Sequence, residues 1–167
     1  MTDAARLLER GELVVFGSGA LAFWMKHAPA SRDVDVWCTP AERGEAIEAL
    51  MGELSWYHER LGVYVEVWGP ETFRAPPAWR SRARTLSLEQ APAVTVRIPH
   101  PHDVLIAKLF RLDPQDQDHV RRILDEYPLA STELDRIVAE IPAADRGDLE
   151  SGLTWLRAQL RGTEGRA

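Results

Sequence analysis

The sequence is poor in cysteine and has no long apolar run. Cys38 is the only cysteine among 167 residues, so an intrachain disulfide is excluded, and a reducing cytoplasm is the expected location. The first residues are charged, and no window approaches the roughly 20 apolar residues of a membrane span. We therefore expect neither a signal peptide nor a membrane-spanning helix.

A basic excess is also missing, since the net charge is −6. Proteins that bind long duplexes neutralise many phosphates with lysine and arginine. The charge therefore argues against a broad DNA-binding surface, although a local patch that holds one RNA end remains open. Lysine itself is rare: the 20 basic residues comprise 18 arginines and 2 lysines, which draws attention to Lys108.

The length and the ordinary apolar fraction predict one compact domain of the α/β (α+β) class with a proper core. Residues 1–99 should form a small mixed sheet with flanking helices, residues 100–161 a helical C-terminal portion of the same unit, and residues 162–167 a mobile tail. Apolar spacing and turn residues predict strands at 13–16 and 33–38, two hairpins (53–60 with 63–69, and 84–89 with 94–98), and helices at 2–10, 18–28, 40–52, 101–112, 116–127, 131–140 and 145–161. Thr39, Pro40 and Glu42 have the spacing of a capping box for the helix at 40–52.

The stretch from Leu13 to Thr39 is the part of the chain with the clearest chemistry. Asp33 and Asp35 are two residues apart in a predicted strand, so both carboxylates leave one face, while Val34 and Val36 turn to the other. Two like charges held this close repel each other. The arrangement is typical of a site for a hard, oxygen-seeking ion such as Mg²⁺.

A glycine–serine turn lies upstream of these acids. Gly17 and Ser18 stand where the first strand ends and the next helix begins, and backbone N–H groups at such a place favour phosphate. A turn that can bind phosphate and a pair of acids that can bind a metal, connected by one helix, predict a site for a nucleoside triphosphate.

Gly17-Ser18 followed by Asp33-Val34-Asp35 resembles the hallmark of the DNA polymerase β-like nucleotidyltransferase superfamily. Over about residues 10–127 the chain most resembles the small bacterial members, which include toxins of toxin–antitoxin pairs. The resemblance implies two Mg²⁺ ions and transfer of a nucleoside monophosphate from a nucleoside triphosphate to an acceptor hydroxyl. The acceptor is left open between a tRNA end, a protein and a small molecule, and a toxin would have a protein antitoxin as its partner.

The resemblance also implies a third acid on a neighbouring strand. Glu66 is the one acid in a run of apolar and aromatic residues, and adjacent strands lie about 4.8 Å apart, within reach of a shared metal. The family more often has aspartate there, so glutamate is a departure. Glu59, on the predicted partner run, is the next candidate.

Lys108 resembles the lysine of the helical region that follows the catalytic sheet in these enzymes, and Asp116 and Asp118 match its acidic continuation. The resemblance implies that Lys108 contacts the triphosphate or holds the active-site acids. The alternative is that Lys108 reaches solvent or pairs structurally with Asp116 or Asp118, since a lysine buried without a partner is costly. Gln115 stands where the family has arginine, a second departure.

Three further features favour ordinary structure over a site. His100 and His102 flank a proline without a third ligand nearby, which is typical of a turn. The arginines of the run 80–84 (Arg80, Arg82 and Arg84) are more typical of an exposed loop than of an RNA contact. Trp37 shares the face of the two aspartates, where it would either belong to the core or stack on a base.

Two rival hypotheses remain beside the enzyme. One is a catalytically impaired nucleotidyltransferase-like module that binds a nucleotide or a protein partner, which Glu66 and Gln115 favour. The other is a plain α/β domain with the acids on its surface, which would place Asp33 and Asp35 in bulk water, far from Gly17.

Overall fold

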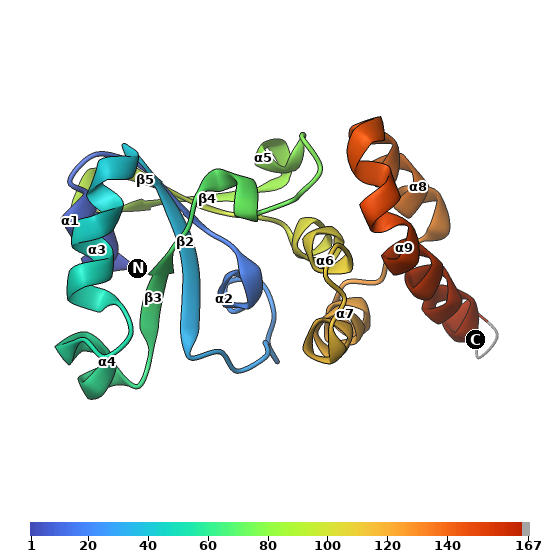
Figure 1. Ribbon diagram of the computed structural model, residues 1–167, viewed down its shortest axis with the longest axis horizontal. Coiled ribbons are helices and arrows are strands. Elements are labelled where there is room, and N and C mark those ends of the chain that lie inside the picture. The colour runs from blue at the N-terminus through green and yellow to red at the C-terminus, as the bar shows by residue number, and fades with distance from the viewer. Residues whose placement is uncertain (165–167) are drawn as a thin grey trace.

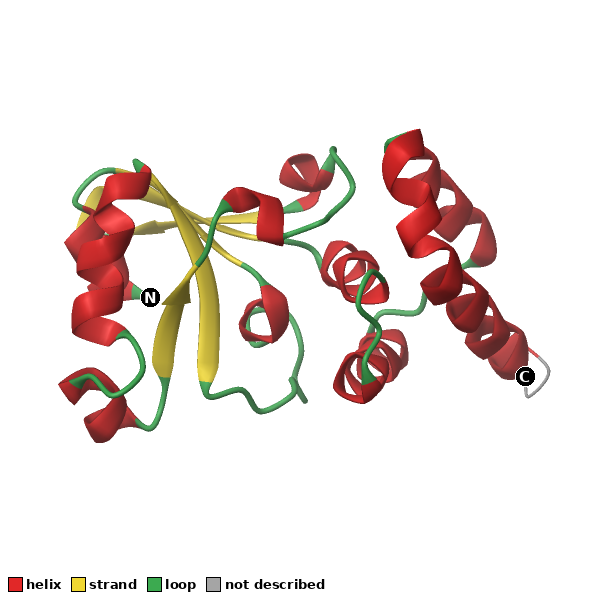
Figure 2. Cartoon of the chain, viewed as in Figure 1, coloured by secondary structure: helices red, strands yellow, loops and turns green. Residues whose placement is uncertain are grey.

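The computed structural model describes the backbone of residues 1–164 and the side chains of residues 1–161. Five strands form one mixed sheet in the order β3-β2-β1-β5-β4 (Figures 1 and 2). They are β1 (Gly11–Val15), β2 (Asp33–Thr39), β3 (Tyr64–Val67), β4 (Arg84–Leu88) and β5 (Ala91–Ile98). The central strand β1 runs antiparallel to β2 and parallel to β5, while β3 joins β2 in parallel and β4 joins β5 in antiparallel fashion. The predicted α/β class and the predicted β4–β5 hairpin are confirmed.

Helices flank the sheet at one end and form most of the molecule at the other (Figure 1). They are α1 (Thr2–Leu8), α2 (Gly17–Leu21), α3 (Gly44–Met51), α4 (Trp56–Leu61), α5 (Trp79–Arg82), α6 (Pro101–Leu109), α7 (Pro114–Glu126), α8 (Ser131–Glu140) and α9 (Ala143–Glu164), with short 3₁₀ turns η1 (Ala41–Arg43) and η2 (Pro70–Thr72). Helix α9 contains the first three residues of the predicted tail, whose last three lie outside the described residues. In the part of the chain that the structure describes, none of the helices combines the length and the apolar character needed to cross a membrane.

The two faces of the sheet bury different residues because strand side chains alternate. Leu13 and Val36 face the main core, which takes in α1 and α3 and continues into α6–α9. The opposite face carries a smaller, aromatic cluster made of Val14, Phe16, Trp37, Phe73 and Trp79. Trp37 is thus on the face of the two aspartates, as predicted, and it is buried in this cluster rather than open to a base.

The hairpin predicted over residues 53–69 is wrong, because its first half is helix α4. The Ser55 hydroxyl accepts a hydrogen bond from the N–H of His58 at 3.2 Å and caps the helix, and Gly62 ends it in the left-handed conformation, with φ +70°. Both are ordinary helix signals that the apolar spacing concealed. Strand β3 instead extends the sheet beside β2, and Glu59 lies exposed on α4.

Two predicted helices also differ in extent. Thr39 pairs with Glu12 as the last residue of β2 and caps nothing, so the predicted capping box does not form and the α-helix begins only at Gly44. Helix α2 ends at Leu21 rather than at residue 28. Beyond it, the N–H groups of Lys26 and His27 donate to the carboxylate of Glu126, both at 2.9 Å, so a distant side chain takes donors that a longer helix would use.

Candidate active site

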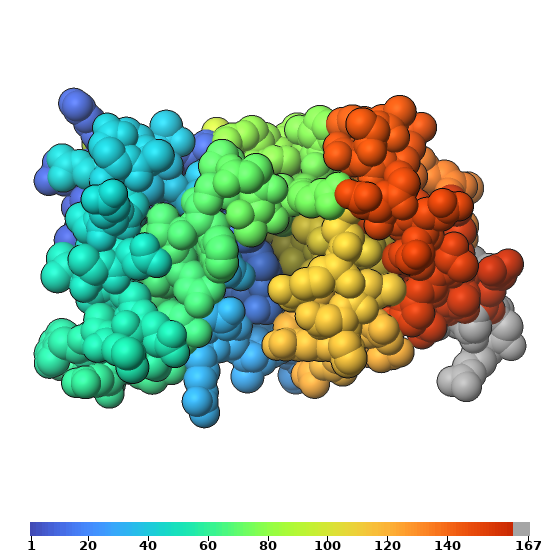
Figure 3. Space-filling view, in the orientation of Figure 1, coloured from blue at the N-terminus to red at the C-terminus, as the bar shows by residue number. Residues whose placement is uncertain are grey.

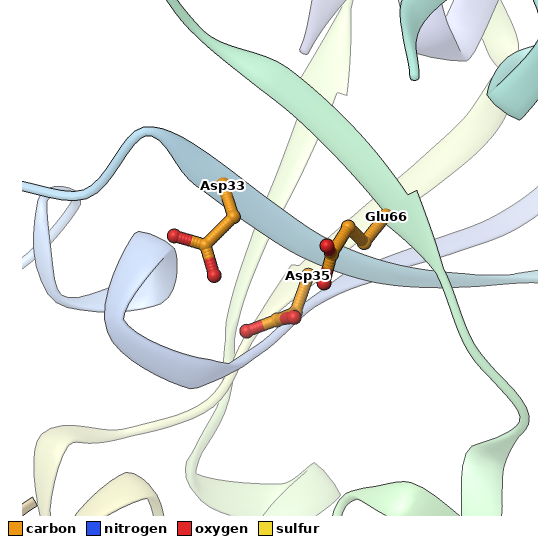
Figure 4. Close-up of side chains that lie close together, drawn as sticks. All are labelled: Asp33, Asp35 and Glu66. Carbon is orange, nitrogen blue, oxygen red and sulfur yellow. The ribbon is translucent and has the colours of Figure 1, made fainter. Parts of the chain in front are cut away.

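Three carboxylates meet at the edge of the sheet. Asp33 and Asp35 leave the same face of β2, as predicted, and the parallel pairing sets Asp35 opposite Glu66 of β3. One oxygen from each of the three carboxylates lies within 4.8 Å of the other two (Figure 4). Among the described residues this is the only group of three or more acids, histidines or cysteines close enough to hold a metal ion. We call it the acidic triad.

The acidic triad is electrostatically strained without a cation. Burial, with the neighbouring charges of Asp33 and Glu66, raises the pKa of Asp35 to about 6, although a hydrogen bond from the indole of Trp68 and the charge of Lys108 oppose the shift. Burial and the charge of Asp33 likewise raise the pKa of Glu66. A dication between these oxygens would relieve the repulsion, and an all-carboxylate donor set suits a hard ion such as Mg²⁺. The residues present therefore fit a metal site.

The glycine–serine corner lies directly against the acidic triad. Gly17 begins α2 with φ +61°, and a β-carbon added to it would stand 2.1 Å from Oδ2 of Asp35. The hydroxyls of Ser18 and Ser31 are 2.9 Å apart, and Ser31 donates to Oδ1 of Asp33 at 2.7 Å. A chain of hydroxyl groups thus connects the corner to the first acid and orients its carboxylate. The predicted proximity of turn and acids is confirmed.

Replacing Gly17 with alanine should therefore disturb the site as well as the backbone. The left-handed conformation alone costs an alanine roughly 1 kcal/mol, and the clash with Asp35 adds to this cost. Gly62→Ala is a matched control, because Gly62 has φ +70° and nothing within 4 Å of the added atom. We expect Gly17→Ala to lower the free energy of unfolding in urea by about 2–3 kcal/mol and Gly62→Ala by about 1 kcal/mol. Equal losses would contradict the contact between Gly17 and Asp35.

A cavity of about 530 Å³ opens in front of the acidic triad, and helices α6 and α7 form its opposite wall. Figure 3 shows the surface hollowed between the sheet edge and these helices. Lys108 lines this wall and is only 9% exposed, and its Nζ donates to Oδ1 of Asp116 at 2.8 Å. Arg111 donates to the other oxygen of Asp116, also at 2.8 Å. Of the two predicted acidic partners, Asp116 is the one that pairs with Lys108, whereas Asp118 pairs with Arg122.

The cavity also contains residues that sequence reasoning missed. Trp68 donates its indole N–H to Oδ1 of Asp35 at 3.0 Å, and Arg74 lies over the ring of Phe110 at 4.0 Å. His119 is buried on the cavity wall, and its Nδ1 has no hydrogen-bond partner among the described residues. Spacing could have indicated Trp68, two residues after Glu66 in the strand predicted at 63–69, and Arg111, three after Lys108 in the helix predicted at 101–112. Both residues lie just beyond the observed ends of β3 and α6. No local signal marks Arg74 or His119.

The weaker sequence candidates have structural partners instead. His100 caps α6, since its Nδ1 accepts a hydrogen bond from the N–H of His102 at 3.2 Å. Burial lowers the pKa of His100 to about 4. The arginines of the run 80–84 are engaged within the chain: Arg80 with Glu12, Arg82 with Asp103 and Glu140, and Arg84 with the carbonyl of Phe23. Glu59 stands outside the acidic triad.

Removing the charge of Asp35 should stabilise the metal-free protein at neutral pH. Because the pKa of Asp35 is raised to about 6, the folded state binds this proton more tightly than the unfolded state, so it loses stability as the pH rises from about 4 to about 6. The shift corresponds to at most ~3 kcal/mol, which solvent around a partly exposed group reduces to ~1 kcal/mol.

We expect Asp35→Asn to raise the free energy of unfolding in urea with a chelator by ~1 kcal/mol at about pH 7.5, and by much less at about pH 4. Wild type measured at both pH values is the reference. The same gain at both would contradict a raised pKa at this position.

Residues 1–141 match the model of a family described as "Nucleotidyltransferase of unknown function (DUF6036)". No curated protein matches the chain. The matched region spans most of the chain and includes the acidic triad, the glycine–serine corner and the pair of Lys108 and Asp116. The chain belongs to this nucleotidyltransferase family.

Proposed function

We propose that the protein is a metal-dependent nucleotidyltransferase that moves a nucleoside monophosphate from a nucleoside triphosphate to an acceptor hydroxyl. The observation that carries the proposal is the pairing of opposite charges across one cavity. The acidic triad forms one side, and Lys108 and Arg111 stand on the other. A volume of about 530 Å³ is within the usual range for small-molecule sites.

The acidic triad would hold the Mg²⁺ ions, two by resemblance to the polymerase β-like enzymes. When bound, such ions increase the nucleophilicity of the acceptor hydroxyl and neutralise charge on the triphosphate and the departing pyrophosphate. The chain's own part is to fix the carboxylates. Ser31 orients Asp33, and the Trp68 indole holds Asp35.

Lys108 and Arg111 would neutralise the triphosphate from the opposite wall. Asp116 fixes both side chains by accepting hydrogen bonds from each, so the two cations are in place before a substrate arrives. Gly17 and Ser18 would bind the β- and γ-phosphates through their backbone N–H groups. Arg111 also supplies a guanidinium on the wall where Gln115 stands in place of the family's arginine.

The acceptor belongs to the same proposal, with a tRNA end, a protein hydroxyl and a small molecule as the candidates. A toxin that modifies one of these would have an antitoxin as its partner. The acidic net charge and the internal pairing of Arg80, Arg82 and Arg84 favour a small or local contact over a long nucleic-acid surface.

The second candidate function is a binding module without catalysis, favoured by the longer side chain of Glu66 and by Gln115. The two are separated by incubating the protein with each radiolabelled nucleoside triphosphate, Mg²⁺, and either total RNA or cell lysate. Label transfer that Asp33→Asn/Asp35→Asn abolishes supports the enzyme. Absence of transfer, with nucleotide still raising the melting temperature, supports the module. Asp125→Asn/Glu150→Gln is the matched control, because it removes two exposed acids on α7 and α9.

A further inference from the structure

The end of α3, the turn that follows it and helix α4 together expose several large apolar side chains. We call residues 50–61 the α3–α4 corner. Four of the five exposed large apolar residues in the described part of the chain lie in it, namely Leu50, Leu54, Trp56 and Leu61. The exposed fraction is 83% for Leu54 and 67% for Trp56. Figure 1 shows α4 at the outer end of the sheet, away from the C-terminal helices.

Leu54 is costly to the isolated chain in two ways. Its backbone is left-handed, with φ +65°, a conformation that bulky side chains rarely adopt and that glycine adopts freely. Its side chain is also almost fully in water. Glycine at this position would remove both costs, whereas a partner that covers the leucine side chain would offset them.

Helix α4 is also incompletely packed. None of its six residues is buried, although it includes Trp56, Tyr57 and Leu61. A surface helix normally buries an apolar stripe against its own core. The α3–α4 corner therefore carries the large apolar side chains that are typical of an interface, although they are exposed to solvent in this chain.

Charge restricts what can cover this surface. Four exposed glutamates lie on the corner or on the adjoining turns of α3, namely Glu45, Glu48, Glu53 and Glu59. Arg60 is the only lysine or arginine of the corner, and its guanidinium lies over the ring of Trp56 at 5.0 Å. Such a surface repels phosphates and attracts positive charge.

We propose that the α3–α4 corner is a docking surface for an amphipathic helix of a separate protein, whose apolar stripe is flanked by lysine and arginine. The apolar stripe covers Leu54, Trp56 and Leu61, and the flanking cations meet the glutamates, as in other complexes that recognise a helix by its apolar face. Strand β3, which carries Glu66, follows α4 directly in the chain, so the docking surface is adjacent in sequence to the strand that supplies the third acid of the triad.

The test uses a fluorescein-labelled synthetic peptide of leucine and lysine, patterned as an amphipathic helix, and follows its anisotropy. We expect saturable binding that weakens with salt. Leu54→Gly should raise the Kd roughly tenfold while the melting temperature stays the same or rises. Glu48→Gln/Glu53→Gln should also raise the Kd and flatten its salt dependence. The control Asp125→Asn/Glu150→Gln should bind like wild type, and a leucine–glutamate peptide should not bind.

Three results would overturn the proposal: no binding of the leucine–lysine peptide, binding unaffected by Leu54→Gly, or equal binding of the leucine–glutamate peptide. Concentration-dependent dimerisation in light scattering that Leu54→Gly abolishes would assign the corner to a second copy of the chain instead. The interaction needs neither metal nor nucleotide, so Asp33→Asn/Asp35→Asn should bind the peptide normally. Failure of this proposal is thereby distinguishable from failure of the proposed catalysis.

Discussion

Asp35→Asn is expected to reduce nucleotidyl transfer by roughly 10³-fold or more, because a metal-bound site loses several kcal/mol of charge stabilisation when a ligand carboxylate becomes a neutral amide. Asparagine has the same shape as aspartate, and its oxygen can still accept the hydrogen bond from Trp68. The substitution therefore removes charge from the acidic triad with little change of packing. The measurement is the initial rate of label transfer from a nucleoside triphosphate at saturating Mg²⁺.

Asp35→Asn should change stability and activity in opposite directions. The metal-free variant should be more stable than wild type at neutral pH, because a raised pKa of Asp35 means that its charge is unfavourable in the folded state. A loss of activity in this variant could then not be attributed to unfolding. Mg²⁺ should raise the melting temperature of wild type and leave that of Asp35→Asn nearly unchanged. A variant that transfers label within threefold of the wild-type rate would rule out Asp35 as a metal ligand.

Asp116→Ala is expected to lower the free energy of unfolding by about 3–5 kcal/mol, because it leaves a buried ammonium group without its partner. Asp116 is 1% exposed and accepts hydrogen bonds from both Lys108 and Arg111. Lys108→Met should cost less, since Asp116 keeps the guanidinium of Arg111 and the methionine fills a similar volume. Urea unfolding monitored by circular dichroism measures both.

The double variant Lys108→Met/Asp116→Ala separates the structural role of this pair from its role in binding. We expect it to be more stable than Asp116→Ala alone, because no unpaired ammonium remains. Transfer activity should stay low, with a raised KM for the nucleoside triphosphate, because the cavity has lost the charge of Lys108. A loss below about 1 kcal/mol for Asp116→Ala would contradict the burial of this ion pair. Recovery of activity in the double variant would contradict a triphosphate contact by Lys108.

Features that depend on a few consecutive residues were predictable from the sequence. Alternation along one strand places Asp33 and Asp35 on a common face without reference to the rest of the chain. The strand-to-helix turn likewise marked Gly17, whose missing side chain leaves space for the carboxylate of Asp35. The hairpin of β4 and β5 was also predictable, because its strands are close in sequence.

Segments whose local pattern fits two different secondary structures were predicted wrongly. Residues 53–60 fit a strand by composition, yet Ser55 and Gly62 cap residues 56–61 as a helix. Residues 22–28 fit a longer helix, yet Glu126, about a hundred residues away, takes the backbone donors of Lys26 and His27. In both segments, hydrogen bonds at specific residues outweigh a weak periodic preference.

The sequence by itself thus determined the mixed α/β class, the paired aspartates and the glycine–serine corner. The tertiary structure alone decided that Glu66 rather than Glu59 completes the acidic triad, that Lys108 pairs with Asp116, and that distant side chains such as Arg74 and His119 line the cavity. The physical reason is that alternation and turn geometry are properties of a few consecutive residues. Strand neighbours and ion-pair partners depend on packing between segments far apart in the chain, which no short sequence pattern specifies.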